Sequence, residues 1–336
     1  MTKMMTMMAA AALLAAGAAE KRGALLFEDT FDGTAVDGTK WGYETAWMRG
    51  KVGAFCHFLP DASTFPRLGE FDVKGLVADL RRMRPDYFMI TLGQNTGYYC
   101  APNPVLEKIA GYPEHARCSA RDIPGEIIAA LKGSGIRFGL YLPNQPAVRD
   151  RQMEDNFGFS PKSDSRGGDA DRLFTAKGSD NWAKAIGYWS RRYGKDVELW
   201  WFDGGYRWLG FSDEHAAKYK AAVRAGNAAA LVSFNAGVGF SSCEKMSDFW
   251  AGEENDCLAV LPAAGGVNAA GVQWQVLSFL GSGWGRPDCR FADAPLKAWI
   301  AEATKRGGAV TLDVHIDCPG GRIPAAQVEQ FARVRP

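Results

Sequence analysis

The sequence predicts an α/β fold of the (β/α)8 TIM-barrel type, and three observations support this prediction. Beyond Glu20, short apolar runs typical of buried strands alternate with amphipathic stretches typical of helices, which indicates a parallel sheet covered by helices. About eight strand candidates in some 280 residues fit a closed barrel better than an open sheet. No G-x-G-x-x-G follows the first strand, so the best sign of a dinucleotide-binding sheet is missing.

The expected strands are short apolar runs, rich in β-branched and aromatic residues, that end at polar or glycine-containing turns. In chain order they cover residues 52–57, 87–92, 136–142, 197–202, 230–235 and 309–315. A further short strand is expected around residues 249–250. Residues 272–279 fit either a strand or a helix, because periodicity alone does not separate the two in a short apolar run.

The expected helices carry apolar residues at helical spacing, as Leu76, Val77 and Leu80 do in the first of them. In chain order they cover residues 71–82, 123–131, 181–193, 213–225, 294–305 and 325–334. A stretch rich in Gly, Ser and Asp, residues 160–171, is expected to form a loop before the third helix. We therefore assign residues 47–336 to a single (β/α)8 barrel.

Residues 1–19 resemble a signal peptide and are excluded from the predicted fold. Lys3 precedes an apolar stretch over residues 4–16, and small residues follow up to Ala19. This stretch is too short for a stable transmembrane helix, and its small-residue end suits a signal peptidase. The sequence therefore predicts export, periplasmic or secreted, with an uncleaved anchor as the alternative. Residues 20–46 are expected to form an N-terminal extension ahead of the barrel.

Composition argues against several classes of partner and cofactor. The 336 residues include 39 basic and 38 acidic side chains, so no charge excess points to nucleic acid or an anionic membrane. The seven cysteines form no C-x-x-C pair, and the four histidines form no H-x-H or H-x-x-x-H pattern. We therefore expect neither a metal nor another cofactor. In an exported protein Cys100 and Cys118 could be bridged, and buried free thiols are the alternative.

Residues 197–206 are the most informative stretch of the chain for function. An apolar strand ends abruptly at Asp203, and the two glycines that follow allow a sharp turn. The carboxylate is therefore presented at the carboxyl end of a strand, with Trp201 and Tyr206 among the nearby aromatic residues. Aromatic rings stack on the C–H faces of sugars, and a carboxylate can meet an anomeric carbon. The pattern favours a sugar-cleaving site, with a helix-capping Asp as the alternative.

In a barrel of this type the site lies at the carboxyl ends of the strands, so candidate site residues can be named from the sequence. Carboxylates, amides and imidazoles on one face suit sugar hydroxyls, which both donate and accept hydrogen bonds. The polar candidates are His57, Gln94, Asn95, Asn144, Asp203, Asn235, Glu253, Glu254 and His315. The aromatic candidates are Tyr98, Tyr99, Trp201, Tyr206 and Trp284. Each polar residue could alternatively be a cap or a turn former.

Four segments, in this order along the chain, resemble motifs of the α-L-fucosidases of glycoside hydrolase family 29. Residues 51–57 resemble the family's K-x-G-x-F strand, which runs into a His. Residues 121–141 resemble its R-D-x-x-G-E helix and K-F-G-x-Y strand, and residues 201–204 match its W-F-D-G. Residues 306–324 resemble its K-G-G-N-x-L-L-N-x-x-P-x-x-x-G-x-I-P run. No single motif is decisive, but their order and spacing make the set fairly specific.

The resemblance implies a retaining glycosidase that cleaves a terminal fucose or a related sugar. It assigns the nucleophile to Asp203, which matches the Asp of W-F-D-G. It assigns the acid/base to Glu253, because residues 248–253 resemble the family's D-[FY]-x-T-P-E segment with Ala-Gly in place of Thr-Pro. Glu254 is the alternative, since only one of two adjacent side chains in an extended segment can point inward.

The sequence departs from the family pattern where the family recognises its sugar. Gln94 and Asn95 stand where the fucosidases have a His-His pair. Neutral amides donate and accept hydrogen bonds but do not titrate near neutrality, as imidazoles do. Two alternatives therefore remain beside a fucosidase: a glycosidase of the same fold with another sugar specificity, and a carbohydrate-binding pseudoenzyme. A second carboxylate within reach of Asp203 would favour an enzyme.

Overall fold

The computed structural model describes residues 45–161, 172–239, 245–268 and 271–336. Residues Tyr43–Pro336 belong to one compact unit. The predicted signal peptide, residues 1–19, and residues 20–44 of the predicted N-terminal extension lie outside the described residues. The predictions for these two segments therefore stay predictions.

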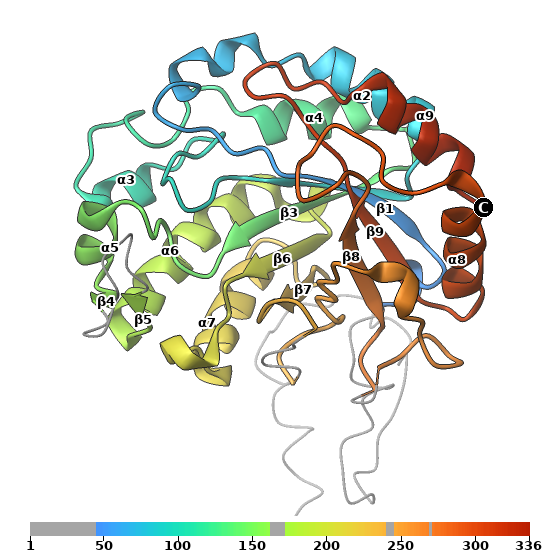
Figure 1. The fold of residues 1–336 in the computed structure, drawn as a ribbon. Coiled ribbons are helices and arrows are strands. Elements are labelled where there is room, and N and C mark those ends of the chain that lie inside the picture. The colour runs from blue at the N-terminus through green and yellow to red at the C-terminus, as the bar shows by residue number, and fades with distance from the viewer. Residues whose placement is uncertain (1–44, 162–171, 240–244, 269–270) are drawn as a thin grey trace, which may run out of the picture. The chain divides into compact units, whose positions relative to one another are not determined.

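Seven parallel strands form one curled sheet, with the helices arranged around its outside (Figure 1). In spatial order the strands are β7 (Leu231–Phe234), β6 (Leu199–Asp203), β3 (Arg137–Pro143), β2 (Tyr87–Thr91), β1 (Val52–Cys56), β9 (Ala309–Asp313) and β8 (Gln275–Phe279). Every neighbouring pair is parallel. All the carboxyl ends therefore lie at the same edge of the sheet, and the polar residues that follow the strands gather there.

An irregular segment, residues 248–254, lies between the two edge strands of this sheet. The backbone N–H of Asp248 donates to the Val232 carbonyl of β7 over 2.8 Å, and that of Glu254 donates to the Leu277 carbonyl of β8 over 2.9 Å. Within the described residues the segment makes isolated bridges at Phe249 and Glu253, not the short strand expected there. The sheet is thus (β/α)8-like, and this segment spans the gap between its edges.

Eight α-helices are found in the described part of the chain. They are α2 (Val73–Met83), α3 (Pro104–Ala110), α4 (Ile123–Leu131), α5 (Arg151–Phe157), α6 (Ala176–Tyr193), α7 (Asp213–Arg224), α8 (Asp293–Lys305) and α9 (Ala325–Val334). Short 3-10 helices cover Thr45–Met48, Phe65–Glu70, Gly194–Asp196, Arg207–Leu209 and Cys257–Ala259. A short antiparallel pair, β4 (Ser160–Pro161) and β5 (Arg172–Leu173), stands apart from the main sheet.

Side-chain caps determine where several helices begin. Thr175 accepts a hydrogen bond from the Gly178 N–H at 2.9 Å, so α6 starts at Ala176 and not at residue 181. The sequence prediction omits α3 and α5, which have seven residues each. They follow the capping residues Asn103 and Asp150, whose side chains accept backbone N–H groups. Residues 272–279, ambiguous from the sequence, contain strand β8.

The strands are buried on both faces, which explains their continuous apolar runs. Inside the curled sheet, the ring of Tyr141 stacks between Phe55 and Trp201, with centroids 5.4 and 5.1 Å away. On the other face, β-strand residues pack against the helices in a larger apolar core. The aromatic stack fills the interior of the curled sheet, and Tyr141 and Trp201 also line the cavity described below.

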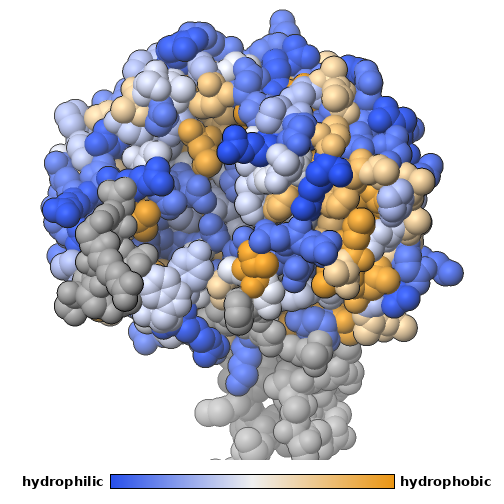
Figure 2. Space-filling view, in the orientation of Figure 1, coloured by the Kyte–Doolittle hydropathy of each residue, from blue (hydrophilic) through white to orange (hydrophobic). Residues whose placement is uncertain are grey.

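The six described cysteines are free thiols, Cys100 and Cys118 included, so the bridge considered between these two does not form here. Cys243 lies outside the described residues. On the face shown in Figure 2, hydrophilic residues cover most of the surface, and hydrophobic residues gather mainly toward the side of α8. No helix of the described ranges is long and apolar enough to cross a membrane.

Candidate active site

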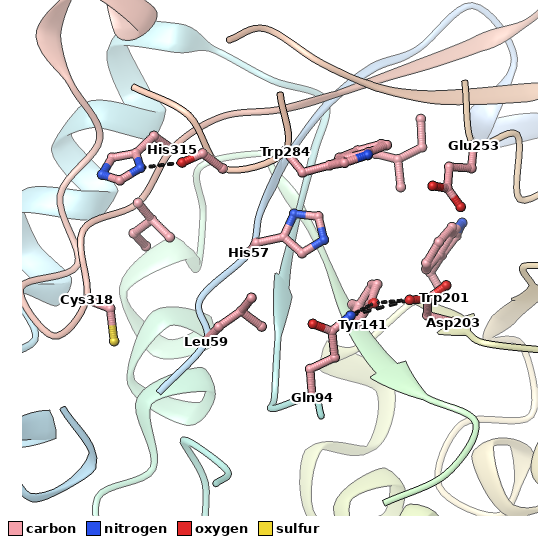
Figure 3. Close-up of a pocket in the computed structure, with 13 residues that line it drawn as sticks. His57, Leu59, Gln94, Tyr141, Trp201, Asp203, Glu253, Trp284, His315 and Cys318 are labelled. Carbon is pink, nitrogen blue, oxygen red and sulfur yellow. Dashed lines mark hydrogen bonds between the residues drawn. The ribbon is translucent and has the colours of Figure 1, made fainter. Parts of the chain in front are cut away.

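A cavity of about 510 Å³ opens at the carboxyl ends of the strands (Figure 3). Polar and aromatic side chains from most strands of the sheet converge on it. Its lining residues are His57, Leu59, Gln94, Tyr141, Trp201, Asp203, Glu253, Leu277, Trp284, Gly285, His315, Ile316 and Cys318. Its volume lies in the range of about 300–1,000 Å³ typical of ligand sites.

Asp203, the last residue of β6, projects into this cavity with both carboxyl oxygens hydrogen-bonded. Gly204 follows with a φ of 77°, a left-handed conformation that turns the chain away directly after the acid. Oδ2 accepts from the Tyr141 hydroxyl at 2.6 Å and from Gln94 Nε2 at 3.3 Å. Oδ1 accepts from Asn235 Nδ2 at 2.9 Å. Three donors therefore stabilise a negative charge on this carboxylate.

Asn235, which follows β7, connects Asp203 to a second acid. Its Nδ2 donates to Asp203 Oδ1 at 2.9 Å and to Glu253 Oε2 at 2.5 Å, so these oxygens are at most the sum of the two distances, about 5.4 Å, apart. Carboxyl groups about 5–5.5 Å apart are typical of retaining glycosidases, and inverting enzymes hold theirs about 6.5–9.5 Å apart.

Glu253 reaches the cavity because the segment before it is pressed against β8. Gly252 has a φ of 63°, and a side chain there would overlap the Gln275 carbonyl. The indole N–H of Trp201 donates to the Ala251 carbonyl at 3.1 Å and holds the same segment from inside the sheet. Glu253 is therefore fixed by backbone packing on one side and by a buried ring on the other.

The surroundings of Glu253 favour its protonated form. Burial is the largest influence and raises the pKa of this carboxyl, and the negative charge of Asp203 raises it further. The hydrogen bond from Asn235 and the nearby His57 oppose this, but the net shift is upward. Burial and the charge of Asp203 also raise the pKa of Tyr141, which keeps its hydroxyl a proton donor. The site thus pairs Asp203, which accepts three hydrogen bonds, with a glutamate that retains its proton more readily than a free glutamate does.

The structure separates the two adjacent glutamates. Glu253 lines the cavity, and Glu254 does not. Burial, followed by the charge of Asp256, raises the pKa of Glu254 as well. Since neighbouring residues of an extended segment point to opposite sides, geometry and not titration distinguishes them.

Two histidines line the cavity opposite the two carboxyl groups, and the backbone of Gly285 connects them through Asp313. His57 Nδ1 lies 3.0 Å from Asp313 Oδ1, and the Gly285 N–H donates to Asp313 Oδ2 at 2.6 Å. His315 Nδ1 donates to the Gly285 carbonyl at 2.6 Å. Burial lowers the pKa of His57, but Asp313, with help from the two carboxylates across the cavity, gives a net rise above the ordinary value of 6.5. His57 is therefore held in its charged, donating form more readily than a free imidazole.

Trp284 forms part of the cavity wall. Its ring lies edge-on to His57, with centroids 5.6 Å apart, and packs on Phe279 with centroids 4.9 Å apart. Seven of the residues predicted from the sequence line this cavity: His57, Gln94, Trp201, Asp203, Glu253, Trp284 and His315. Asn235 adjoins them through its two hydrogen bonds.

The other predicted residues lie elsewhere. Tyr99 is completely buried: its hydroxyl donates to the Pro146 carbonyl and its ring packs on tryptophans of the helix layer, because its side chain points away from the cavity. Tyr98 accepts from Arg117 at 2.9 Å. The backbone carbonyl of Asn95 accepts a hydrogen bond from the Arg149 N–H. The buried Asn144 donates its backbone N–H to the Asp203 carbonyl.

Tyr206 stacks on the exposed Trp208, with centroids 5.5 Å apart, and is not part of the cavity lining. Sequence reasoning missed Tyr141 and Asp313, which both act within the site. Asp313 takes the place of the second Asn in the family's K-G-G-N-x-L-L-N run. This departure from the family pattern could have marked Asp313 as a site residue. Tyr141 lies inside a strand, where an apolar role is the ordinary expectation. In the described ranges, no three His, Cys, Asp or Glu side chains are placed to hold a metal ion.

The sequence matches no protein-family model and no curated protein. Several solved structures share its fold at low sequence identity. The endo-fucoidan hydrolase MfFcnA4 of glycoside hydrolase family 107 is similar over 86% of this chain and 52% of its own, at 14% identity and a TM-score of 0.66. This chain thus spans about half the length of that protein.

Two further structures match along most of their own length. The endo-fucoidan hydrolase P5AFcnA of family 107 is covered to 92%, and 87% of this chain is matched, at 11% identity and a TM-score of 0.64. The α-L-fucosidase AlfC of Lactobacillus casei, solved with its α-L-fucose product, is covered to 95%, and 86% of this chain is matched, at 17% identity and a TM-score of 0.58. The fold of this chain is therefore the one shared by these fucose-related glycoside hydrolases.

Proposed function

We propose that this protein is a retaining glycoside hydrolase that acts on an α-L-fucosyl residue or a closely related sugar. The observation that carries the proposal is the single Asn235 amide that donates to both Asp203 and Glu253. It keeps one oxygen of each carboxyl group within about 5.4 Å of the other, and this separation supports a nucleophile and acid/base pair of the retaining kind. A carbohydrate-binding pseudoenzyme has no need of this second, closely spaced carboxyl group.

In the first step, Asp203 attacks the anomeric carbon while Glu253 gives its proton to the leaving oxygen. The bond to the leaving group breaks as a glycosyl–Asp203 ester forms. In the second step, Glu253, now ionised, removes a proton from water, and the resulting nucleophile releases the sugar from Asp203. The raised pKa of Glu253 suits the first role, because the group must carry a proton before it can donate one.

The choice of sugar rests on three supports. The shared fold is that of proteins named as α-L-fucosidase and endo-fucoidan hydrolase. The sequence carries ordered motifs that resemble those of family 29 fucosidases. Trp284 and Leu277 offer an apolar wall for a methyl group, and His57 offers a charged donor for a hydroxyl. A glycosidase with another sugar specificity stays the second candidate, because Gln94 binds the nucleophile where the fucosidases have an imidazole pair.

The decisive experiment is a panel of aryl glycosides that includes 4-nitrophenyl α-L-fucopyranoside. We expect turnover of the fucoside or of one related aryl glycoside, with NMR showing early product of retained anomeric configuration. Asp203→Asn should lose nearly all of that turnover, and Asp213→Asn, the same change at the start of α7, should keep it. Inverted product, or near-normal turnover by Asp203→Asn, would overturn the proposed mechanism.

We also propose that the protein is exported after removal of its first 19 or so residues, as the apolar stretch ahead of Ala19 indicates. Expression of the full chain in a bacterium with a general secretion pathway tests this. The expected result is a mature chain in the periplasm or medium whose N-terminus lies near Glu20. A full-length chain that stays in the membrane fraction would favour the uncleaved anchor.

A further inference from the structure

The cavity extends well beyond the two catalytic carboxyl groups. Asp203 is the last residue of β6, and His315 follows β9. Three strands, β3, β2 and β1, lie between β6 and β9 in the sheet. Strands in a sheet are about 4.8 Å apart, so β6 and β9 stand on opposite sides of the curled sheet. In Figure 3, His57 lies between the carboxylates on one side and His315 with Cys318 on the other. The same cavity reaches both sides.

We call the part of the cavity beyond His57 the distal lobe, and define it by Leu59, His315, Ile316 and Cys318. Its chemistry is amphipathic. Leu59 and Ile316 present aliphatic surface, and Leu59 is 38% exposed although it is apolar. His315 lines the lobe and donates its Nδ1 proton to the Gly285 carbonyl, so the neutral ring keeps Nε2 as a hydrogen-bond acceptor.

The distal lobe is a poor site for an anion. None of the residues that line the cavity is Lys or Arg. The carboxylates of Asp61 and Asp317 lie near its edge: burial is the largest cause of the raised pKa of Cys318, and these two charges add to it. A sulfate or carboxylate group would meet these negative charges, and no Lys or Arg side chain lines the cavity to pair with it. An uncharged ligand with both hydroxyl groups and C–H faces fits the lobe best.

We propose that the distal lobe is a second sugar subsite, which binds an uncharged sugar residue joined to the residue that is being cleaved. The volume supports this, because a cavity of about 510 Å³ is of the size that takes a drug-sized ligand and exceeds the needs of one deoxyhexose. The aliphatic side chains pack on the C–H face of the second residue, and His315 accepts from one of its hydroxyls. The inference rests on the proposed function and makes oligosaccharides the preferred substrates over single sugars.

Cys318 allows the lobe to be tested without any turnover. Iodoacetamide labelling of Cys318 in the whole protein is followed by peptide mass spectrometry, with Cys289 as the internal control. We expect an unsulfated α-linked fucose trisaccharide to slow labelling of Cys318 at least fivefold, and L-fucose at the same saturation to slow it less than twofold. Labelling of Cys289, which does not line the cavity, should not change. Equal protection by both sugars, or by neither, would overturn the proposal.

A second measurement uses Ile316→Trp, which enlarges a side chain that lines the lobe, and Ile109→Trp, the same change at a partly buried position on α3 outside the cavity lining, as the control. We expect the ratio of kcat/KM for the trisaccharide to kcat/KM for the aryl fucoside to fall at least tenfold in Ile316→Trp and to stay unchanged in Ile109→Trp. An unchanged ratio in a folded Ile316→Trp protein would contradict the second subsite. If no glycoside is turned over at all, the proposed function fails, and the labelling experiment still decides the lobe.

Discussion

Asn235 shows how one neutral side chain can organise two acids with different tasks. Its amide group donates to both carboxyl groups and accepts from neither, so it is compatible with either acid being ionised. The carboxyl group of Asp203 accepts hydrogen bonds from three side chains, those of Gln94, Tyr141 and Asn235. Among the described hydrogen bonds, the carboxyl group of Glu253 accepts only one, from the Asn235 amide. The raised pKa of Glu253 makes this group the more suitable proton carrier for the proposed acid-assisted cleavage.

We predict that Glu253→Gln lowers kcat by a factor of about 10²–10⁴ for a glycoside with a poor leaving group. The loss should be much smaller for an activated aryl glycoside, whose leaving oxygen needs little protonation, until the second step becomes limiting. Glu254→Gln is the matched control and should change neither value by more than about twofold, because Glu254 lies outside the cavity. Equal losses in the two variants would assign no acid/base role to Glu253.

We predict that Asp313→Asn lowers the pKa of His57. The sign follows from the surroundings: Asp313 raises this pKa and burial lowers it, so removal of the carboxylate leaves burial dominant. The charged imidazole is then lost at lower pH, and the alkaline limb of kcat/KM should move to lower pH. NMR titration of the His57 ring measures the shift directly, and an unchanged titration would show that Asp313 does not hold the proton.

At this scale the sequence could predict side chains that follow a strand, because a parallel barrel brings them to one edge. His57, Gln94 and Glu253 come from distant parts of the chain and line the same cavity as Asp203. Tyr141 could not be found in that way, since it lies within β3 and its direction depends on the pleat. Asp313 ends β9, but the strand predicted there extends to residue 315, so Asp313 does not count as a residue at a strand end. The prediction of Tyr99 as a site residue is wrong for a related reason: a residue that follows a strand can also point into the helix layer, where Tyr99 is buried.

Among the elements, the segment of residues 248–254 matters most for the proposed function, because it holds Glu253 at the cavity. Gly252 is tightly packed within it, against the backbone of β8. We predict that Gly252→Ala destabilises the protein by about 1–3 kcal/mol more than Gly133→Ala, because its new side chain must displace the backbone of β8. Both glycines have positive φ, so the backbone strain of about 1 kcal/mol or more is common to the two variants. Gly133 is exposed, with open space where a side chain would lie.

Urea unfolding gives the two free energies, and turnover of the aryl glycoside gives the second readout. Gly252→Ala should also lose activity, because the clash moves Glu253 away from Asn235. If Gly252→Ala is as stable and as active as Gly133→Ala, the backbone of β8 can move to make room for the new side chain without a loss of stability, and the prediction is wrong.

Long, strongly patterned elements are the ones that the sequence predicts well. The six apolar runs and the six amphipathic stretches all correspond to strands and helices, with ends that differ by a few residues. The two seven-residue helices, α3 and α5, are too short to show a helical period and are recognisable only by their caps. Residues 248–254 could not be predicted as they are, because their place between β7 and β8 is set by contacts with both strands.

The arrangement of the whole molecule places the two carboxyl groups and the two imidazoles on opposite sides of one cavity. Asp203 ends β6 and Asn235 follows β7, and His57 and His315 follow β1 and β9. The sequence alone does not show how far apart these two groups of residues lie, since their separation depends on the order of the strands and on the curl of the sheet. The stacked rings beneath the cavity then connect the two sides, because Tyr141 lies between Phe55 of β1 and Trp201 of β6.

The last prediction separates the contribution of this inner stack to stability from its contribution to the site. Trp201→Phe keeps a ring in the stack but leaves the Ala251 carbonyl without its indole donor, and Trp189→Phe does the same to the Pro102 carbonyl in the helix layer. An unsatisfied buried acceptor costs about 1–3 kcal/mol, so thermal or urea unfolding should show similar losses in the two variants. Only Trp201→Phe should also lower kcat, at least about tenfold, because Ala251 precedes Gly252 and Glu253 in the segment that the indole holds. Equal activity in two equally destabilised proteins would show that the stack supports the fold without positioning the acid.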